Sequence, residues 1–283
     1  MENEKAGQVD YHYGFYAAIH FDYEFLNLKI TLQQELELGD QPVRVDMVVI
    51  KRNRRRALSD PIGRAFKGRN ILEYKSPRKS LTINDFYKVQ GYACIYKSLS
   101  KRVNAIPIED LTITIFCHMY PRKMFADLKK EGFNLEEVRG GIYYVRGPLF
   151  IFTQIVVISR LPEGEYEELK ILAPKAKKED VAKFLDKASK NPSDHVSAIL
   201  RVSMAANEDL YQKLGVEGPM KDVFESIFHK ELSAAKNEGW TAGRNEERAN
   251  IISRMLAGGM TPQQIADIIA LPLSEVLALS GGA

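Results

Sequence analysis

Two acidic residues and a lysine in this chain have the types and spacing that metal-assisted chemistry requires. Asp46 interrupts an otherwise apolar segment, and Glu73 and Lys75 lie two positions apart in a second one. Carboxylate oxygens suit a hard cation such as Mg²⁺, which lowers the pKa of a bound water and offsets charge that builds on a phosphate. A lysine beside the ion can orient that water or stabilise the developing negative charge. These residues therefore indicate metal-assisted hydrolysis of a phosphodiester.

The two segments that carry these residues are both predicted to be strands. β-Branched residues dominate Val43–Ile50, and Asn70–Lys75 is a second, largely apolar run. The period of two along a strand points the side chains of Glu73 and Lys75 to the same face. Asp46 would be costly to bury in its strand unless it were paired or bound to a metal. The alternative is that Glu73 and Lys75 form a salt bridge on an exposed strand and that Asp46 ends a turn.

The arrangement resembles the signature of the PD-(D/E)XK nuclease superfamily, an acid at the end of one strand and Glu-x-Lys on the next. Asp46 matches the first acid, Glu73 the second and Lys75 the lysine. Within the superfamily the chain is most similar to the transposon-linked, transposase-like nucleases of bacteria that promote recombination. The resemblance implies an α/β protein with a restriction-endonuclease-like mixed sheet flanked by helices, followed by an α-helical C-terminal region. It also implies a DNA endonuclease that depends on Mg²⁺, for which Mn²⁺ can substitute.

The same resemblance suggests further ligands and contacts. The backbone carbonyl of Tyr74 is a candidate for an additional metal ligand. In the superfamily the first helix often supplies another acid, and Glu24 is the candidate, with Glu35 and Glu37 on the next strand as rivals. Relatives also place a glutamine or another polar residue on the helix after Glu-x-Lys. Gln90 is the candidate to position substrate or water there, and the alternative is a polar residue on an amphipathic helix packed across the sheet.

A strongly basic loop separates the two strands. Eight lysines and arginines between Lys51 and Arg69 stand against one acid, Asp60, in a chain whose formal net charge is only +3. A basic loop at the edge of a metal site could hold a phosphate backbone without reading sequence. The alternative is a solvated loop whose charges only aid solubility. The predicted nucleic-acid contacts are Arg52, Arg54, Arg55, Arg56, Lys67 and Arg69.

The remaining pattern of residues predicts how these strands are embedded. Apolar periodicity and turn signals predict the following elements: a helix over Asp10–Leu26, an antiparallel hairpin of Lys29–Leu38 with Val43–Ile50, a helix from the cap Asn84 to Ser98, a strand over Asp110–Cys117, a helix over Arg122–Lys130, two short strands between Gly132 and Val145, and a strand over Ile151–Ile158. This order predicts a mixed α/β core.

Composition changes beyond the turn at Leu161–Gly164, where amphipathic helical patterns replace strands. We therefore predict a nuclease-like core over residues 1–160, a helical extension over 161–240 and a small helical unit over 241–283. The last unit resembles a helix-turn-helix, with Thr261 as a helix cap and Pro262 at the first helical position. Its second helix, Leu273–Leu279, has no Arg, Lys, Asn or Gln to reach DNA, so protein contact or packing is favoured. The helical half could build a homodimer surface.

Composition also excludes several classes of protein. No apolar run approaches the ~20 residues that a membrane span needs, and the first residues are not a secretion signal. Two cysteines are too few for a disulfide framework or a cysteine zinc site. A cytoplasmic protein is predicted, with no membrane partner. The alternatives to a DNA endonuclease are a catalytically inactive nuclease-fold module that binds DNA or a protein, and a nuclease acting on RNA.

Overall fold

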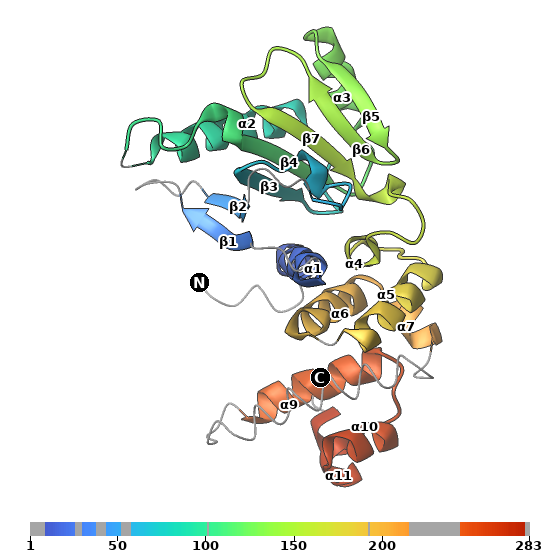
Figure 1. Cartoon of the computed structure of the whole chain (residues 1–283). Coiled ribbons are helices and arrows are strands. Elements are labelled where there is room, and N and C mark those ends of the chain that lie inside the picture. Colours follow the sequence, from blue (N-terminus) through green and yellow to red (C-terminus); the bar gives the residue numbers. More distant parts are fainter. Residues whose placement is uncertain are drawn as a thin grey trace. The chain divides into compact units, whose positions relative to one another are not determined.

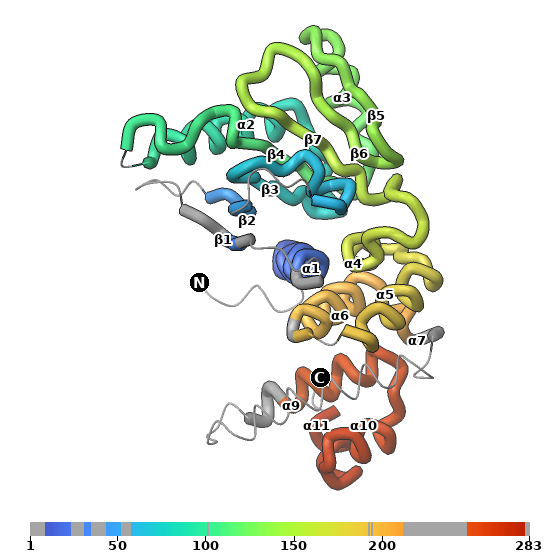
Figure 2. The backbone as a smooth tube through the Cα atoms, viewed as in Figure 1, coloured from blue at the N-terminus to red at the C-terminus, as the bar shows by residue number. Residues whose placement is uncertain are grey.

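The computed structural model describes residues 9–25, 30–37, 44–51, 58–100, 102–191, 193–214 and 244–280. The chain divides into two compact units (Figures 1 and 2). One, here called the sheet unit, is Asp22–Tyr166. The other, the helical unit, combines Met1–Phe21 with Glu167–Ala283. The first helix therefore begins in the helical unit, although the sequence pattern had grouped it with the nuclease-like core.

The sheet unit contains a seven-stranded mixed sheet in the order β1-β2-β3-β4-β7-β6-β5. The strands are β1 Ile30–Glu37, β2 Arg44–Lys51, β3 Arg69–Lys75, β4 Leu111–Cys117, β5 Asn134–Arg139, β6 Ile142–Arg146 and β7 Phe152–Val157. β1, β2 and β3 are antiparallel neighbours, β3, β4 and β7 run parallel, and β6 and β5 continue from β7 in antiparallel pairs. The predicted hairpin and the predicted strands are confirmed.

The central strand β4 is buried along its whole length. A strand that is covered on both faces needs an apolar or internally satisfied side chain at every position. On one face of β4 the side chains are the apolar Ile113 and Ile115. On the other face they are Thr112 and Thr114, whose hydroxyl groups form hydrogen bonds inside the protein. Thr112 donates to Asn70 Oδ1, and Thr114 Oγ1 accepts from Gln154 Nε2 at 2.8 Å. The buried hydroxyls are therefore compatible with the core.

Two helices, α2 Ile83–Ser98 and α3 Arg122–Lys130, pack on the face of the sheet that carries Ile113 and Ile115. This core includes Ile71, Phe86, Val89, Ile113, Ile115, Met124 and Leu128. The N-terminal cap of α2 is Thr82 rather than the predicted Asn84. Thr82 forms a capping box with Asp85, which satisfies two backbone N–H groups and therefore begins the helix earlier.

Residues 58–68, the described part of the segment between β2 and β3, lie against the other face of the sheet. Gln154, which alternates with the α2-facing Ile155, donates to the Ile62 carbonyl at 2.9 Å. Lys51 Nζ donates to the Phe66 carbonyl at 3.1 Å, and Asp60 accepts a hydrogen bond from Tyr166. Burial lowers the pKa of Lys51. The described part of the basic loop is thus held by buried polar contacts.

The helical unit contains most of the remaining helices. Its elements are the first part of α1 Tyr11–Phe25, then α4 Glu167–Lys170, α5 Lys178–Lys190, α6 Asp194–Ala206, α7 Glu208–Leu214, α9 Arg244–Ala257, α10 Pro262–Ile269 and α11 Leu273–Ser280. Phe21 of α1 packs on Phe184 of α5 with ring centroids 5.4 Å apart. The apolar face of α1 is therefore part of this core.

α10 and α11 confirm the two helices predicted for the tail, and α9 precedes them. Thr261 caps α10 through a capping box with Gln264, and Pro262 occupies its first turn. Arg248 of α9 forms an ion pair with Glu275 of α11 at 2.8 Å. None of the helices in the described part of the chain has the length and apolar composition needed to cross a membrane.

Candidate functional site

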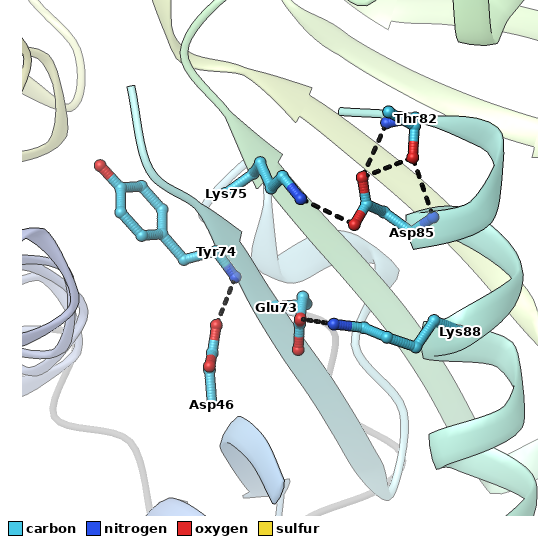
Figure 3. Close-up of polar contacts among 7 residues, drawn as sticks. All are labelled: Asp46, Glu73, Tyr74, Lys75, Thr82, Asp85 and Lys88. Carbon is cyan, nitrogen blue, oxygen red and sulfur yellow. Dashed lines mark hydrogen bonds and ion pairs between the residues drawn. The ribbon is translucent and has the colours of Figure 1, made fainter. Parts of the chain in front are cut away.

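Asp46 lies where β2 and β3 separate. The last residue pair between these strands is Met47 with Leu72, so Asp46 and Glu73 lie one position beyond the ladder. At this point Asp46 Oδ2 accepts a hydrogen bond from the Tyr74 backbone N–H at 2.8 Å (Figure 3). Beyond the last backbone pair, the side chain of Asp46 rather than a backbone carbonyl accepts the hydrogen bond from β3. The acid of β2 is therefore attached to the strand that carries Glu73 and Lys75.

Tyr74 separates the two charged residues of β3. Its side chain is buried and points away from Glu73 and Lys75, which extend toward α2 (Figure 3). The N–H and C=O groups of one strand residue point to the same side of the strand. Because the Tyr74 N–H bonds to Asp46, the Tyr74 carbonyl also lies on the side of Asp46. This orientation is the one that a carbonyl ligand beside Asp46 would need.

Lys75 is held by the first turn of α2. Its Nζ donates to Asp85 Oδ1 at 2.7 Å, and the two side chains are 23% and 19% exposed. The other oxygen of Asp85 accepts from the Thr82 N–H at 2.9 Å and from the Thr82 hydroxyl at 2.7 Å. Burial acts to raise the pKa of Asp85, but the hydrogen bonds from Lys75 and Thr82 outweigh it and hold the pKa below its usual range.

Glu73 faces a second residue of α2. Lys88 Nζ lies 3.6 Å from Glu73 Oε1, with 47% of the lysine side chain and 15% of the glutamate side chain exposed. Burial acts to lower the pKa of Lys88, but Glu73, Tyr92 and Asp85 together outweigh it and raise that pKa, with Glu73 contributing most of the three. Sequence reasoning did not include Asp85 or Lys88 in the site. Their spacing of three on a capped helix directly after Glu-x-Lys was the available signal.

Gln90 lies farther along α2 and makes a different contact. Its Nε2 donates to Thr153 Oγ1 in β7 at 2.9 Å. Thr153 pairs with Ile113 of β4, which in turn pairs with Ile71 of β3. Two strand spacings of ~4.8 Å put β7 about 10 Å from β3. The structure therefore gives Gln90 a hydrogen bond to the sheet away from β3, in line with the alternative role on an amphipathic helix.

The donor set at Asp46 fits a hard cation. Two carboxylates and a backbone carbonyl are oxygen ligands, and Mg²⁺ is commonly bound through one or two carboxylates while it keeps several waters. The side chains of Glu24, Glu35 and Glu37, the candidates for a third carboxylate, lie outside the described residues. Among the residues that are described, no group of three or more His, Cys, Asp and Glu side chains is arranged to hold a metal ion.

The predicted nucleic-acid contacts are only partly described. Arg52, Arg54, Arg55 and Arg56 lie outside the described residues, whereas Lys67 is exposed and Arg69 is half-buried. Arg69 begins β3, and the four residues from there to Glu73 span about 13 Å at ~3.3 Å per residue. The loop therefore joins β3 at the end opposite to Glu73. The expectation that it borders the metal site is wrong for Lys67 and Arg69, because the antiparallel β2–β3 connection must lie at the far end of both strands.

The chain was compared with models of protein families, with curated proteins and with solved structures. None of these comparisons found a match. The contacts among β2, β3 and α2 are therefore the basis on which a function can be assigned.

Proposed function

We propose that this protein is a Mg²⁺-dependent DNA endonuclease of the PD-(D/E)XK type. The observation that carries the proposal is the hydrogen bond from the Tyr74 N–H to Asp46, which brings the acid of one strand to the strand of Glu73 and Lys75. A mixed sheet with helices packed on it agrees with the restriction-endonuclease-like fold that the resemblance implies. Both Asp46 and the Glu-x-Lys motif lie at one end of neighbouring strands, as that chemistry requires.

Each residue has a distinct role in the proposed reaction. Asp46 and Glu73 bind the metal ion through carboxylate oxygens, and the Tyr74 carbonyl is an additional ligand. The bound Mg²⁺ supplies an activated water and offsets charge on the phosphate. Lys75 presents a compact positive charge with three N–H donors, which can orient that water or stabilise the charge that develops on a phosphate oxygen.

The proposed partner is DNA, with a link to mobile elements or recombination that follows from the resemblance. The basic residues of the β2–β3 loop would contact the phosphate backbone, and the described ones, Lys67 and Arg69, would do so away from the metal site, since Arg69 lies at the opposite end of β3 from Glu73. We also propose that two copies of the chain associate through the C-terminal helical half. In the cell we propose a cytoplasmic location.

Plasmid nicking tests the catalytic assignment. Wild-type protein should nick supercoiled plasmid with Mg²⁺ or Mn²⁺ and lose this activity in EDTA. Asp46→Ala and Lys75→Ala should each lower the rate by about 100-fold or more, because each removes a group that stabilises developing charge. Equal cleavage by all three proteins would show that a contaminant is responsible, and the assignment would be abandoned.

A second candidate function is a nuclease-fold module that binds DNA or a protein without cutting. Two observations favour it: the described residues contain no group of three metal-ligating side chains, and both charged residues of the Glu-x-Lys motif are ion-paired with α2. Calorimetric titration with Mn²⁺ separates the two functions. An active enzyme takes up the ion in a manner that depends on Asp46 and Glu73, whereas an inactive module shows no specific uptake.

A further inference from the structure

The four charged residues at the contact of β3 with α2 are paired in a crossed pattern. Glu73 and Lys75 share a face of β3, and Asp85 and Lys88 are three residues apart on α2, so each pair could bond within its own element. The structure instead joins Lys75 to Asp85 at 2.7 Å and places Lys88 3.6 Å from Glu73 (Figure 3). The lysine of the motif is therefore bonded to the helix rather than to the neighbouring glutamate.

Asp85 is itself held at a fixed position. Its Oδ2 accepts two hydrogen bonds from Thr82, while its Oδ1 accepts from Lys75. The Asp85 N–H donates back to Thr82 Oγ1 at 3.2 Å. A carboxylate tied into a helix cap has little rotamer freedom left to lose, so the charge-assisted bond to Lys75 has a defined direction. The cap thereby anchors the ammonium group.

We propose that Asp85 is a positioning residue for Lys75. This inference rests on the proposed function and adds to it the residue that keeps the lysine ammonium away from Glu73. Without Asp85, the Lys75 ammonium would lose its 2.7 Å partner and would exchange between solvent and the carboxylate two residues away on its own strand face. Lys75 would then leave its place beside the reacting phosphate, and it would neutralise a carboxylate intended for the metal ion. The role acts through Lys75 and requires no contact between Asp85 and the substrate.

A purely structural role for Asp85 as part of the helix cap makes a different prediction. Thr82→Ala removes the capping hydroxyl, and so lowers the stability of the helix, but it keeps the bond between Asp85 and Lys75. Asp85→Asn keeps an oxygen that can accept from the Thr82 N–H but removes the charge that holds Lys75. Asp85→Glu keeps both features, since glutamate is common at this position of capping boxes. The three variants therefore separate capping from positioning.

The experiment measures two quantities in full-length protein. The first is the acylation rate of Lys75 by an amine-reactive ester, followed by mass spectrometry, with exposed Lys130 as the internal reference. Removal of the Asp85 charge should raise the rate several-fold in Asp85→Asn, whereas Thr82→Ala and Asp85→Glu should resemble the wild type. The second is plasmid nicking with Mg²⁺, which should fall about tenfold or more in Asp85→Asn alone, because a displaced catalytic group costs that much.

The outcomes distinguish this inference from the proposed function. If Lys75 acylation is unchanged in Asp85→Asn, or rises equally in Thr82→Ala, the positioning role is overturned. If acylation changes as expected but the wild type does not nick plasmid, the anchoring of Lys75 by Asp85 is supported and the endonuclease proposal fails. Normal nicking by Asp85→Asn together with faster acylation would show that the anchored position is not needed, which also overturns the inference.

Discussion

Single side chains at the end of β3 decide which charges are available for chemistry. Asp46 is tied to a backbone N–H, Lys75 to Asp85, and Glu73 lies beside Lys88. The Lys75 bond is short and partly shielded from water, whereas the lysine opposite Glu73 is 47% exposed. Exposed ion pairs stabilise by only about 0–1 kcal/mol. The contact of Lys88 is therefore the weaker of the two, and it is the one that a divalent cation could replace.

Lys88→Met tests this difference at the residue scale. Its ammonium would repel the cation that we propose at Glu73, so its removal should tighten Mn²⁺ binding about threefold to tenfold, which is the size of such a charge interaction in a high dielectric. Calorimetric titration of the metal-free protein measures the change. Lys130→Met is the matched control, because Lys130 is paired with Asp127 of α3 at 3.3 Å. Unchanged or weaker binding by Lys88→Met would mean that Lys88 does not compete with the ion.

At the scale of elements, the packing of helix α1 depends on a glycine. A Cβ atom added to Gly14 would lie 2.8 Å from Leu172 Cδ2 and from Val202 Cβ, closer than side chains allow. Gly91 of α2, in contrast, has nothing within 4 Å of such an atom. Both glycines lower the stability of a helix by the same intrinsic propensity. A side chain at Gly14 would meet closely packed neighbours, whereas one at Gly91 would meet none. Their substitution separates propensity from tertiary contact.

Gly14→Ala and Gly91→Ala should therefore change stability in opposite directions. Alanine gains up to about 1 kcal/mol over glycine inside a helix. Overpacking costs about 1–3 kcal/mol, so Gly14→Ala should be destabilised overall. Gly91→Ala meets no neighbours and should be stabilised. Chemical denaturation of both variants measures the free energy of unfolding. A stabilised Gly14→Ala protein would contradict the close approach of α1 to Leu172 and Val202.

At the scale of the whole molecule, long-range polar contacts close the sheet unit. Asp60 lies between β2 and β3, and its side chain accepts hydrogen bonds. They come from the hydroxyl of Tyr166, the last residue of the sheet unit, from the Gly63 N–H and from the hydroxyl of Tyr23. Tyr166 Oη also accepts from the Ile62 N–H at 3.3 Å. Burial raises the pKa of Asp60 although these donors act to lower it. A carboxyl group whose folded pKa lies above its unfolded value favours folding when protonated.

The stability contributed by Asp60 should therefore depend on pH in a defined direction. It is fully present below the unfolded pKa of about 3.8–3.9, and it is lost as the pH rises through the raised folded value. Denaturant titrations between pH 3 and pH 7 on wild type and Asp60→Asn test this. The stability of the wild type relative to the variant should fall as pH rises. A relative stability that rises over the same interval would contradict the burial of this carboxyl group.

The sequence alone determined the strands, the helices α1, α2, α3, α10 and α11 and the three candidate residues, because these depend on local periodicity and on a motif within one segment. It predicted β3 and α3 nearly to the residue, and it placed Glu73 and Lys75 on one face by strand alternation. The cap of α2 was missed by two residues because Asn84 competes with the stronger box of Thr82 and Asp85.

Only the tertiary structure decided which side chains meet. Strand register placed the basic loop at the far end of β3, and the docking of α2 put Asp85 and Lys88 beside the motif while it directed Gln90 to Thr153. A helix presents a different residue every 100° of turn, so the face that contacts the sheet is fixed by packing against several strands at once. The spacing of Asp85 and Lys88 places them on one face of the helix, but it does not say which strand residues that face meets, and this is why their pairing with Lys75 and Glu73 came only from the structure.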